Sequence, residues 1–340
     1  MVFWFWVGIG ILLVPSVAVG LGLTALYLYL KWKYIPFLVR VFQEKPLFVV
    51  PRGQPTDTAE HVTFLSIDGL TLRGCYLRTS CLSRKGVILF GLEFGSGRWA
   101  SRQYCESLVA SGYDVFAYEP RNQGDSDRDP GYEPLQWVTD KDVADMRAAI
   151  KYLASRDDAD PAGVGVFGIS KGGSTAFLVS QTEKAIRCLV TDGAYATYTT
   201  MVPYMQRWIK IYSDRYRVQR AVPAWFYGFL GMSGVKQVAR NRGVNYPSVE
   251  KAVKKFRRPL LMIHGEGDTY IKPDMARALF GLAKGPKDLW IVPRAKHNQA
   301  LHLATEEYQR RVTAFFDQHL AGINAPSTAE PEAPPAAAAG

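Results

Sequence analysis

Short apolar runs alternate with amphipathic stretches from about residue 60 to residue 320. Eight of the runs are typical of strands: HVTFLSIDG (61–69), LTLRGCYLRTS (70–80), GVILF (86–90), SGYDVFAYEP (111–120), GVGVFG (163–168), AIRCLVTDG (185–193), RPLLMIHG (258–265) and DLWIVPR (288–294). The first two are joined by a turn at Asp68-Gly69. Helical patterns lie over Trp99–Ala110, from about Leu135 to Ser155, and over Leu301–Leu320. The alternation predicts a mostly parallel eight-stranded sheet with helices on both faces.

The N-terminal stretch, residues 1–30, has no charged side chain. About 20 apolar residues cross a bilayer, so this run is long enough to span one. Aromatic rings that suit the headgroup level lie toward its two ends: Trp4, Trp6, Tyr27, Tyr29 and Trp32. We therefore predict one transmembrane helix at 1–30 that anchors the chain in a membrane.

The charges that flank this span set its expected orientation. Lys31, Lys33 and Arg40 follow the span, whereas only the α-amino group precedes it. The positive-inside rule then places the large C-terminal part of a single-pass protein in the cytoplasm. A cleaved signal peptide fits less well because the stretch is long and lacks a basic start. A re-entrant hairpin kinked at Pro15 and a buried core helix are the other interpretations.

The remaining chain divides into three parts by pattern. A juxtamembrane linker, 31–58, leads to the alternating domain at 59–320, and the Pro/Ala-rich tail at 321–340 cannot bury a core. Within the domain the alternation breaks at about 195–256, where we predict a helical cap insert. Its cations are Arg207, Lys210, Arg215, Arg217 and Arg220. We expect its aromatic residues to line an acyl groove and its cations to face anionic lipids; the alternative is aromatic core with solvated charges outside.

Composition narrows the class of partner. Of the 340 residues 48% are hydrophobic, and 41 Lys+Arg against 31 Asp+Glu give a net charge of +10. This charge suits an anionic surface. Zinc-finger spacing, an aromatic RNA-binding signature and a basic heptad helix are missing from the sequence, so we expect no nucleic-acid partner. Four cysteines without a C-x-x-C pair indicate reduced thiols, in keeping with the cytoplasm, and no zinc site.

Three predicted strands end in residues that can act together on an acyl group. Ser170 follows GVGVFG in a G-x-S-x-G pattern, Asp268 follows RPLLMIHGEG, and His297 follows DLWIVPRAK. A serine hydroxyl becomes nucleophilic when an imidazole takes its proton, and a buried carboxylate must orient that imidazole. We expect a catalytic triad of these three residues. Asp192, at the end of the preceding strand, is the rival acid.

This part of the chain, roughly Ala59–Leu320, resembles the α/β-hydrolase superfamily. Three segments resemble the branch of monoglyceride lipases, protein depalmitoylases and serine aminopeptidase-like hydrolases. They are GISKGG (168–173), RPLLMIHGEGDTYIKP (258–273) and GPKDLWIVPRAKHNQAL (285–301). The resemblance implies Ser170 as nucleophile, His297 as base, Asp268 as its orienting acid, and an acyl-serine intermediate. The segment YEPRNQGDSD (118–127) resembles a loop of this family. By this resemblance, Arg121 and Gly124 would shape the loop and would take no part in the chemistry.

The loop after Phe90 departs from the family pattern, which has histidine in place of Phe90. An oxyanion hole uses backbone N–H groups, so we expect its donors to be the N–H of Lys171 and that of Leu92. A carboxylate beside a developing oxyanion would oppose it. We therefore expect the Glu93 side chain to point away toward a loop cation; the alternative is contact with substrate.

These patterns together predict a membrane-anchored serine hydrolase that cleaves acyl esters or thioesters, and we expect lipid-derived substrates. It would need neither metal nor organic cofactor. A serine peptidase or acyltransferase could use the same triad. A membrane-tethered binding protein without turnover is the third interpretation, and the complete triad argues against it.

Overall fold

The computed structural model describes residues 2–43, 50–212 and 223–322. Its centre is one eight-stranded sheet in the order β1-β2-β4-β3-β5-β6-β7-β8. The strands are β1 (Glu60–Leu65), β2 (Thr71–Leu77), β3 (Gly86–Gly91), β4 (Tyr113–Glu119), β5 (Val164–Ile169), β6 (Ile186–Asp192), β7 (Leu260–Gly265) and β8 (Lys287–Val292). Only the pairings β1–β2 and β2–β4 are antiparallel. All eight strands predicted from the sequence are confirmed.

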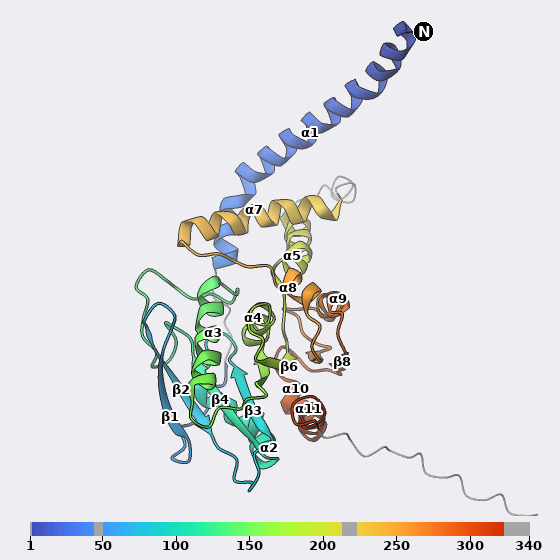
Figure 1. The fold of residues 1–340 in the computed structure, drawn as a ribbon. Coiled ribbons are helices and arrows are strands. Elements are labelled where there is room, and N and C mark those ends of the chain that lie inside the picture. Colours follow the sequence, from blue (N-terminus) through green and yellow to red (C-terminus); the bar gives the residue numbers. More distant parts are fainter. Residues whose placement is uncertain (1, 44–49, 213–222, 323–340) are drawn as a thin grey trace, which may run out of the picture.

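Helices cover both faces of the sheet (Figure 1). They are α2 (Ser101–Ala110), α3 (Asp140–Ser155), α4 (Lys171–Val179), α8 (Val249–Lys255), α9 (Pro273–Leu282), α10 (Ala300–Leu303) and α11 (Thr305–His319), with a short 3-10 helix at Arg98–Ala100. Side chains of α3, α4, α8 and α9 share one buried cluster with the strands, and those of α2 and α11 share the other. The parallel strands β3, β5 and β6 are buried along most of their length because helices lie on both sides.

Two helix boundaries differ from the prediction. α3 begins at Asp140, not near Leu135, because Thr139 and Asp142 form a capping box in which each side chain bonds the other's backbone N–H. The C-terminal helical pattern is divided at Ala304, which ends α10 and precedes α11 with a non-helical φ of −140°. Apolar periodicity continues through both places, so periodicity alone did not reveal them.

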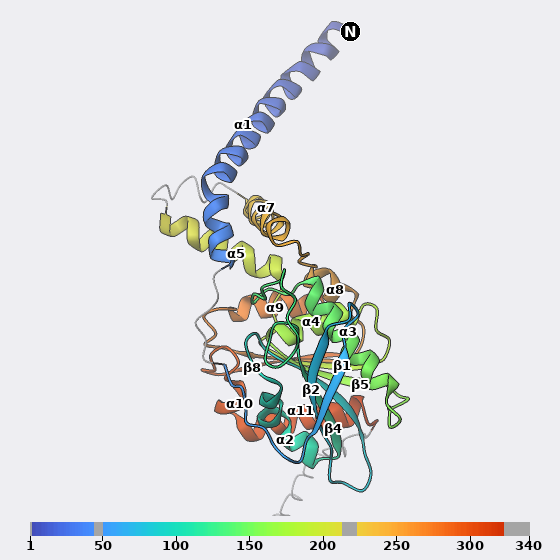
Figure 2. The same ribbon diagram turned by 90° about the vertical axis from the view of Figure 1, so that its left-hand side faces the viewer.

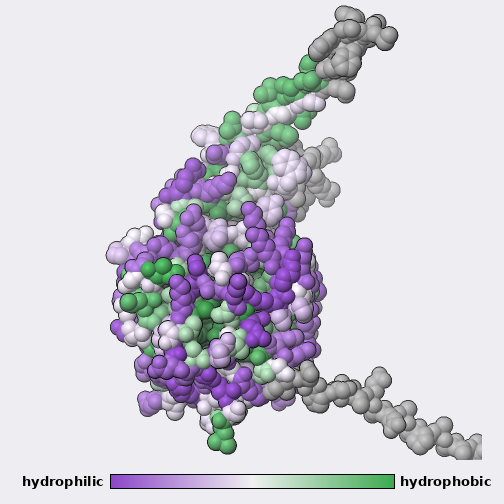
Figure 3. All heavy atoms as spheres, viewed as in Figure 1, coloured by the Kyte–Doolittle hydropathy of each residue, from purple (hydrophilic) through white to green (hydrophobic). Residues whose placement is uncertain are grey.

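The N-terminal helix α1 (Val2–Gln43) is longer than predicted and includes Pro15 and Pro36. Residues 31–43 therefore continue the helix instead of forming a linker. Because α1 is continuous it is not a re-entrant hairpin. Its span Leu13–Pro36 has a mean hydropathy of 1.8 and is not buried, so it is not a core helix either. It remains a candidate membrane span or signal sequence. Figure 3 shows its apolar surface standing out from a mostly polar domain.

The C-terminal third of α1 packs on the predicted cap, of which α5 (Thr197–Tyr212) and α7 (Ala224–Arg242) are described. Figures 1 and 2 show α7 crossing α1, with α5 between α7 and the domain. The Tyr27 hydroxyl lies 2.6 Å from that of Ser233 on α7. The ring of Phe42 stacks on that of Trp137, with centroids 4.7 Å apart and planes 2° apart. The end of α1 is thus joined to the domain.

Some predicted features lie outside the described part. Arg215, Arg217 and Arg220 of the cap fall in 213–222, and the side chains of Arg207 and Lys210 are not described either. Apart from Ala321 and Gly322, the predicted tail also lies outside it.

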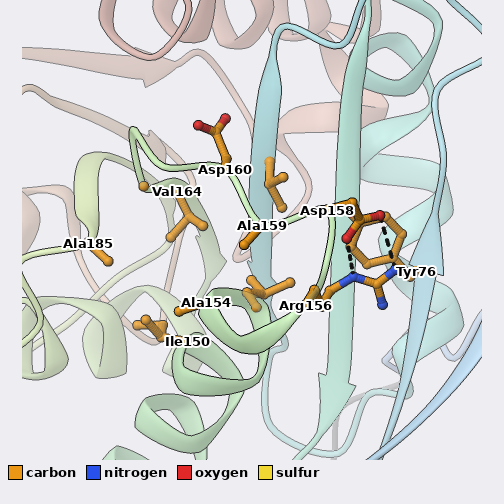
Figure 4. A pocket seen from close by; sticks show the side chains of 12 residues that line it. Tyr76, Ile150, Ala154, Arg156, Asp158, Ala159, Asp160, Val164 and Ala185 are labelled. Atoms are coloured by element: carbon orange, nitrogen blue, oxygen red, sulfur yellow. Dashed lines mark hydrogen bonds and ion pairs between the residues drawn. The ribbon is translucent and has the colours of Figure 1, made fainter.

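A shallow pocket lies at the amino-terminal ends of the parallel strands, the edge of the sheet opposite Ser170 (Figure 4). Its polar members are already paired: Arg156 contacts Asp158, and it also bonds Glu60 of β1 and the Tyr152 hydroxyl. This cluster ties β1 to the end of α3, so we regard the pocket as structural.

Candidate active site

Ser170 stands on a sharp turn between β5 and α4. Its φ of +50° and ψ of −110° are strained for a residue with a side chain. The turn closes because its neighbours lack Cβ atoms. A Cβ on Gly168 would come within 2.4 Å of the Gly173 backbone, and one on Gly172 within 2.2 Å of the Gly91 carbonyl oxygen. The geometry is that of a nucleophile elbow.

A chain of hydrogen bonds joins the three residues predicted as the triad. Ser170 Oγ lies 3.0 Å from His297 Nε2, and His297 Nδ1 lies 2.6 Å from Asp268 Oδ2. An ionised carboxylate only accepts, so Nδ1 carries the proton and Nε2 is free to accept from the serine hydroxyl. This is the arrangement in which a histidine can act as a base toward serine.

The loop after β7 fixes the carboxylate. Asp268 Oδ1 accepts the backbone N–H groups of Tyr270 and Ile271 at 2.8 and 2.9 Å, which leaves Oδ2 for the histidine. A second histidine, His264 on β7, lies beneath this loop with Nε2 2.6 Å from the Ile271 carbonyl oxygen. Burial lowers the pKa of His264, which favours its neutral form as donor in that bond. The sequence analysis overlooked His264, because a histidine inside an apolar strand has no distinguishing pattern.

The partner of His297 Nδ1 is Asp268, not the rival acid Asp192. Asp192 is fully buried at the end of β6, and its Oδ2 accepts the Tyr308 hydroxyl at 3.0 Å. Burial, opposed by this hydrogen bond, raises the pKa of Asp192 to about 7. Its main-chain carbonyl accepts the Ser170 N–H at 2.7 Å. Asp192 therefore supports the elbow, as a brace and not as the partner of the histidine.

The two expected oxyanion donors lie on adjoining segments. Lys171 is the first residue of α4, where N–H groups have no partner within the helix. Leu92 follows β3, and its carbonyl oxygen would lie 2.8 Å from a Cβ on Gly172. The Lys171 side chain turns away to Asp142 Oδ1 and the Leu135 carbonyl oxygen, each at 2.8 Å. Only its backbone N–H is thus placed to serve at the elbow.

Phe90 belongs to the core. It is buried on β3, with its ring 5.4 Å from that of Phe167 and 5.5 Å from that of Tyr104. Phe90, which stands where the family has histidine, therefore packs in the core and does not displace the backbone of the loop that follows it.

The expectation for Glu93 was wrong. Its side chain does not turn away to a cation: it is buried, lines the same pocket as Ser170 and His297, and accepts the Asn298 side-chain amide at 2.6 Å. Its pKa is raised by burial, against the effect of Asn298. The reason for the error is Asn298, directly after His297 with a φ of +55°, which the sequence analysis did not consider.

The pocket beside Ser170 has a volume of about 80 Å³. Its other lining residues are Phe94, Gln136, Trp137, Tyr195, Thr200, Tyr204, Tyr270 and Ile271. Tyr195 and Tyr204 follow β6 and belong to the cap, and the Tyr204 hydroxyl donates to the Tyr270 carbonyl in the acid loop. Aromatic side chains of the cap region therefore do reach the site, as the sequence analysis expected. Among the described residues, no cluster of His, Cys, Asp or Glu is placed to bind a metal ion.

The loop of Arg121 and Gly124 is structural, as expected. Arg121 is buried and binds Asp145 on α3 and Asp68 in the β1–β2 turn, each at 2.6 Å. Gly124 has a φ of +52°, and a Cβ there would collide with the Glu119 side chain. The loop thus links the antiparallel edge of the sheet to α3.

The sheet order, the elbow and the placement of the three residues define an α/β hydrolase. Within that superfamily the chain belongs to the prolyl oligopeptidase family, whose model matches residues 102–322, more than half of the chain. The superfamily inferred from the motifs is confirmed, and the hydrolase class with it.

One solved structure has the same fold, and two further proteins are similar in sequence. The Pyrococcus furiosus esterase Pf2001 superimposes with a TM-score of 0.60 at 22% identity, covering 81% of this chain and 98% of its own. YfhR of Escherichia coli O157:H7, an uncharacterised protein, is 25% identical over 267 residues, covering 77% of this chain and 76% of its own. WAV2 of Arabidopsis thaliana, an α/β-hydrolase domain-containing protein, is 23% identical over 300 residues, covering 83% and 90%.

Proposed function

We propose that this α/β hydrolase is a membrane-anchored serine hydrolase that cleaves carboxylic esters or thioesters through an acyl-serine intermediate. The observation that carries the proposal is the hydrogen-bonded series Ser170–His297–Asp268 at a strained elbow. Strain in a side-chain-bearing residue persists where the surroundings enforce it, and functional sites are where it gathers.

The steps follow from the atoms in place. Ser170 Oγ attacks the substrate carbonyl carbon while its proton passes to His297 Nε2. The carbonyl oxygen becomes an oxyanion, held by the N–H groups of Lys171 and Leu92, and one such donor contributes about 3 kcal/mol to the transition state. The imidazolium, oriented by Asp268, then protonates the leaving oxygen or sulfur as its bond to carbon breaks. Water repeats the sequence on the acyl-serine and releases the acid.

The aromatic pocket supports an apolar acyl group, and lipid-derived esters are the substrates that a membrane anchor would bring closest. One partial relative, the thiohydrolase aneE of Aspergillus aculeatus, is 28% identical over 137 residues, 41% of its length, and is in keeping with thioesters. The family match also supports a second candidate, a serine peptidase, because an amide forms the same acyl-serine.

The anchor proposal rests on α1 and its packing. Leu13–Pro36 is apolar enough to cross a bilayer, and the same helix continues to Phe42, which is buried against the domain. A cleaved signal sequence would remove these contacts. The cap residues Trp225 and Phe229 are exposed on α7, and the Phe229 ring lies 5.0 Å from that of Tyr27 on α1. These exposed rings support a cap that faces the membrane.

A fluorophosphonate probe tests the chemistry. We expect it to label the full-length protein and not Ser170→Ala, while Ser174→Ala, which alters a buried hydroxyl one helical turn later, keeps some labelling. A folded protein with no Ser170-dependent labelling would refute the serine-hydrolase proposal. A panel of matched oxygen esters, thioesters and amides then ranks the substrate classes, and a clear preference for amides would favour the peptidase.

Carbonate extraction of cell membranes tests the anchor. We expect the intact chain, detected by an epitope at each end, to stay with the membrane pellet. Loss of the N-terminal epitope from the mature protein would identify α1 as a cleaved signal sequence and refute the anchor. Protease protection of the same two epitopes in sealed vesicles determines whether the catalytic domain faces the cytoplasm.

A further inference from the structure

The carboxylate of Glu93 occupies an unusual place, in the catalytic pocket and directly after the expected oxyanion donor Leu92. It is 8% exposed, and it lines the pocket together with Ser170 and His297. Buried carboxylates are costly unless each oxygen finds a donor. The role of Glu93 can therefore be inferred from the hydrogen-bond partners of its two carboxylate oxygens.

Only one of these oxygens has a hydrogen-bond partner among the residues that the structure describes. Oε2 accepts the Asn298 amide at 2.6 Å, and this bond fixes the direction of the side chain because Asn298 adjoins His297 in a tight loop. Oε1 is buried and has no hydrogen-bond partner among the described residues. A purely structural glutamate would be expected to have both oxygens paired. The unpaired oxygen belongs to a side chain that lines the pocket.

The cations of this region are paired elsewhere. Lys171, whose ammonium lies 5.6 Å from the centre of the Phe94 ring, is bound to Asp142. Arg98 is paired with Glu119 and Asp125. No salt bridge to Glu93 exists among the residues that the structure describes. The Glu93 carboxylate therefore lies at the pocket wall with no lysine or arginine partner among the described residues.

The remaining wall is aromatic. Phe94, Trp137, Tyr195, Tyr204 and Tyr270 all line the pocket. Aromatic rings attract cations through their π-faces, and an aromatic enclosure with one carboxylate is a setting in which a desolvated ammonium is favoured over a neutral group. A hydroxyl could also donate to Oε1, but it would gain little from the rings.

We propose that Glu93 Oε1 binds a positively charged amino group of the substrate, so that the site selects esters or thioesters carrying an ammonium close to the scissile carbonyl. This rests on the proposed function and refines its substrate class. A bound ammonium would place a hydrogen-bond donor on Oε1 and a compensating charge beside the buried carboxylate. The apolar remainder of the substrate would lie along the rings.

The test compares three ethyl esters of nearly equal size, of alanine, of lactic acid and of isobutyric acid, which carry an ammonium, a hydroxyl and a methyl on the same carbon. In a second series of esters, the ammonium, hydroxyl and methyl groups are carried by the alcohol part of the ester instead of the acyl part. At a pH where the amine is protonated, we expect wild type to prefer the ammonium ester over the methyl ester by about tenfold or more in kcat/KM in one series, the range of a charge-assisted hydrogen bond.

Glu93→Gln keeps the shape of the side chain and removes its charge, so the ammonium-to-methyl ratio should fall well below its wild-type value. Glu306→Gln, which removes an exposed carboxylate on α11, is the matched control and should keep the wild-type ratio. Wild type itself offers a test without substitution: butylammonium should inhibit hydrolysis of the methyl ester more strongly than 1-pentanol does, which covers the case that Glu93→Gln fails to fold.

An equal preference for the hydroxyl ester would overturn the charge assignment, and so would an unchanged ratio in folded Glu93→Gln. If wild type hydrolyses the methyl ester but shows no preference for the ammonium ester in either series, this inference is refuted and the proposed function is not. Absence of fluorophosphonate labelling at Ser170 and of all ester turnover would instead refute the proposed function.

Discussion

Replacing Phe42 by alanine should weaken substrate binding without touching the reacting groups. Phe42 is 5% exposed, stacks on Trp137 at 4.7 Å and meets the Tyr246 ring edge-on at 5.2 Å. Truncating a buried phenylalanine costs about 3–5 kcal/mol, of which about 1 kcal/mol per ring pair comes from the aromatic contacts. The loss falls where α1 meets the domain, against the Trp137 ring that lines the catalytic pocket.

Because Trp137 would lose a neighbour that holds its ring, about 1 kcal/mol of the loss should reach the pocket wall. That corresponds to a roughly fivefold higher KM, with kcat changed less than about twofold. The assay is steady-state hydrolysis of esters with short, medium and long acyl chains by the full-length protein in detergent. Phe42→Tyr, which keeps the ring, should behave like wild type.

The control for a general effect on α1 is Leu28→Ala, at an exposed position on the same helix. An unchanged KM for Phe42→Ala across all chain lengths would refute the argument. An equal change in Leu28→Ala would do so too, because the effect would then come from the helix and not from the stacked ring.

Four further substitutions probe the support of the site. Gly172→Ala places a Cβ 2.2 Å from the Gly91 carbonyl oxygen, so at least tenfold lower activity and a lower Tm are expected; wild-type values would show that the elbow can widen. Asp268→Asn should lower kcat by about 10⁴. Asp192→Asn should act on stability: the pKa of Asp192 is about 7 when folded, so the folded state binds its proton more tightly and wild type loses up to about 4 kcal/mol as pH rises from about 4 to about 7. The Asn variant should lack this loss, and Tm measured across that pH range decides. Arg121→Ala leaves the buried Asp145 carboxylate without its cation and should cost about 3–5 kcal/mol, seen as a lower Tm with a nearly unchanged KM in any surviving folded protein.

Much of the fold could be predicted because its signals are local. Each strand is a short apolar run bounded by turn residues. The elbow depends on three glycines that can be read directly from the sequence: Gly168, Gly172 and Gly173. The placement of Asp268 and His297 followed from a general rule, that functional side chains gather at the carboxyl ends of parallel strands. The structure puts both beside Ser170.

What escaped prediction depends on contacts between distant segments. The direction of Glu93 is set by Asn298, which lies 205 positions further along the chain. The extension of α1 to Gln43 is stabilised by packing on α7 and Trp137, and apolar content alone ended the expected span near residue 30. The sequence around Glu93 does not identify Asn298 as its partner, and the sequence around Phe42 does not identify Trp137.

The continuity of α1 also fixes a length. Phe42 lies six residues after Pro36, the last residue of the candidate span, and a helix rises about 1.5 Å per residue, so it stands about 9 Å beyond that end. In the anchored protein that we propose, Trp137 and the pocket behind it would be held within roughly that height of the headgroups. A lipid would need to rise only partly from the bilayer to reach the pocket that Trp137 lines, whereas a large folded substrate would find the approach from the membrane side closed. The helix would then act as a spacer that selects by reach.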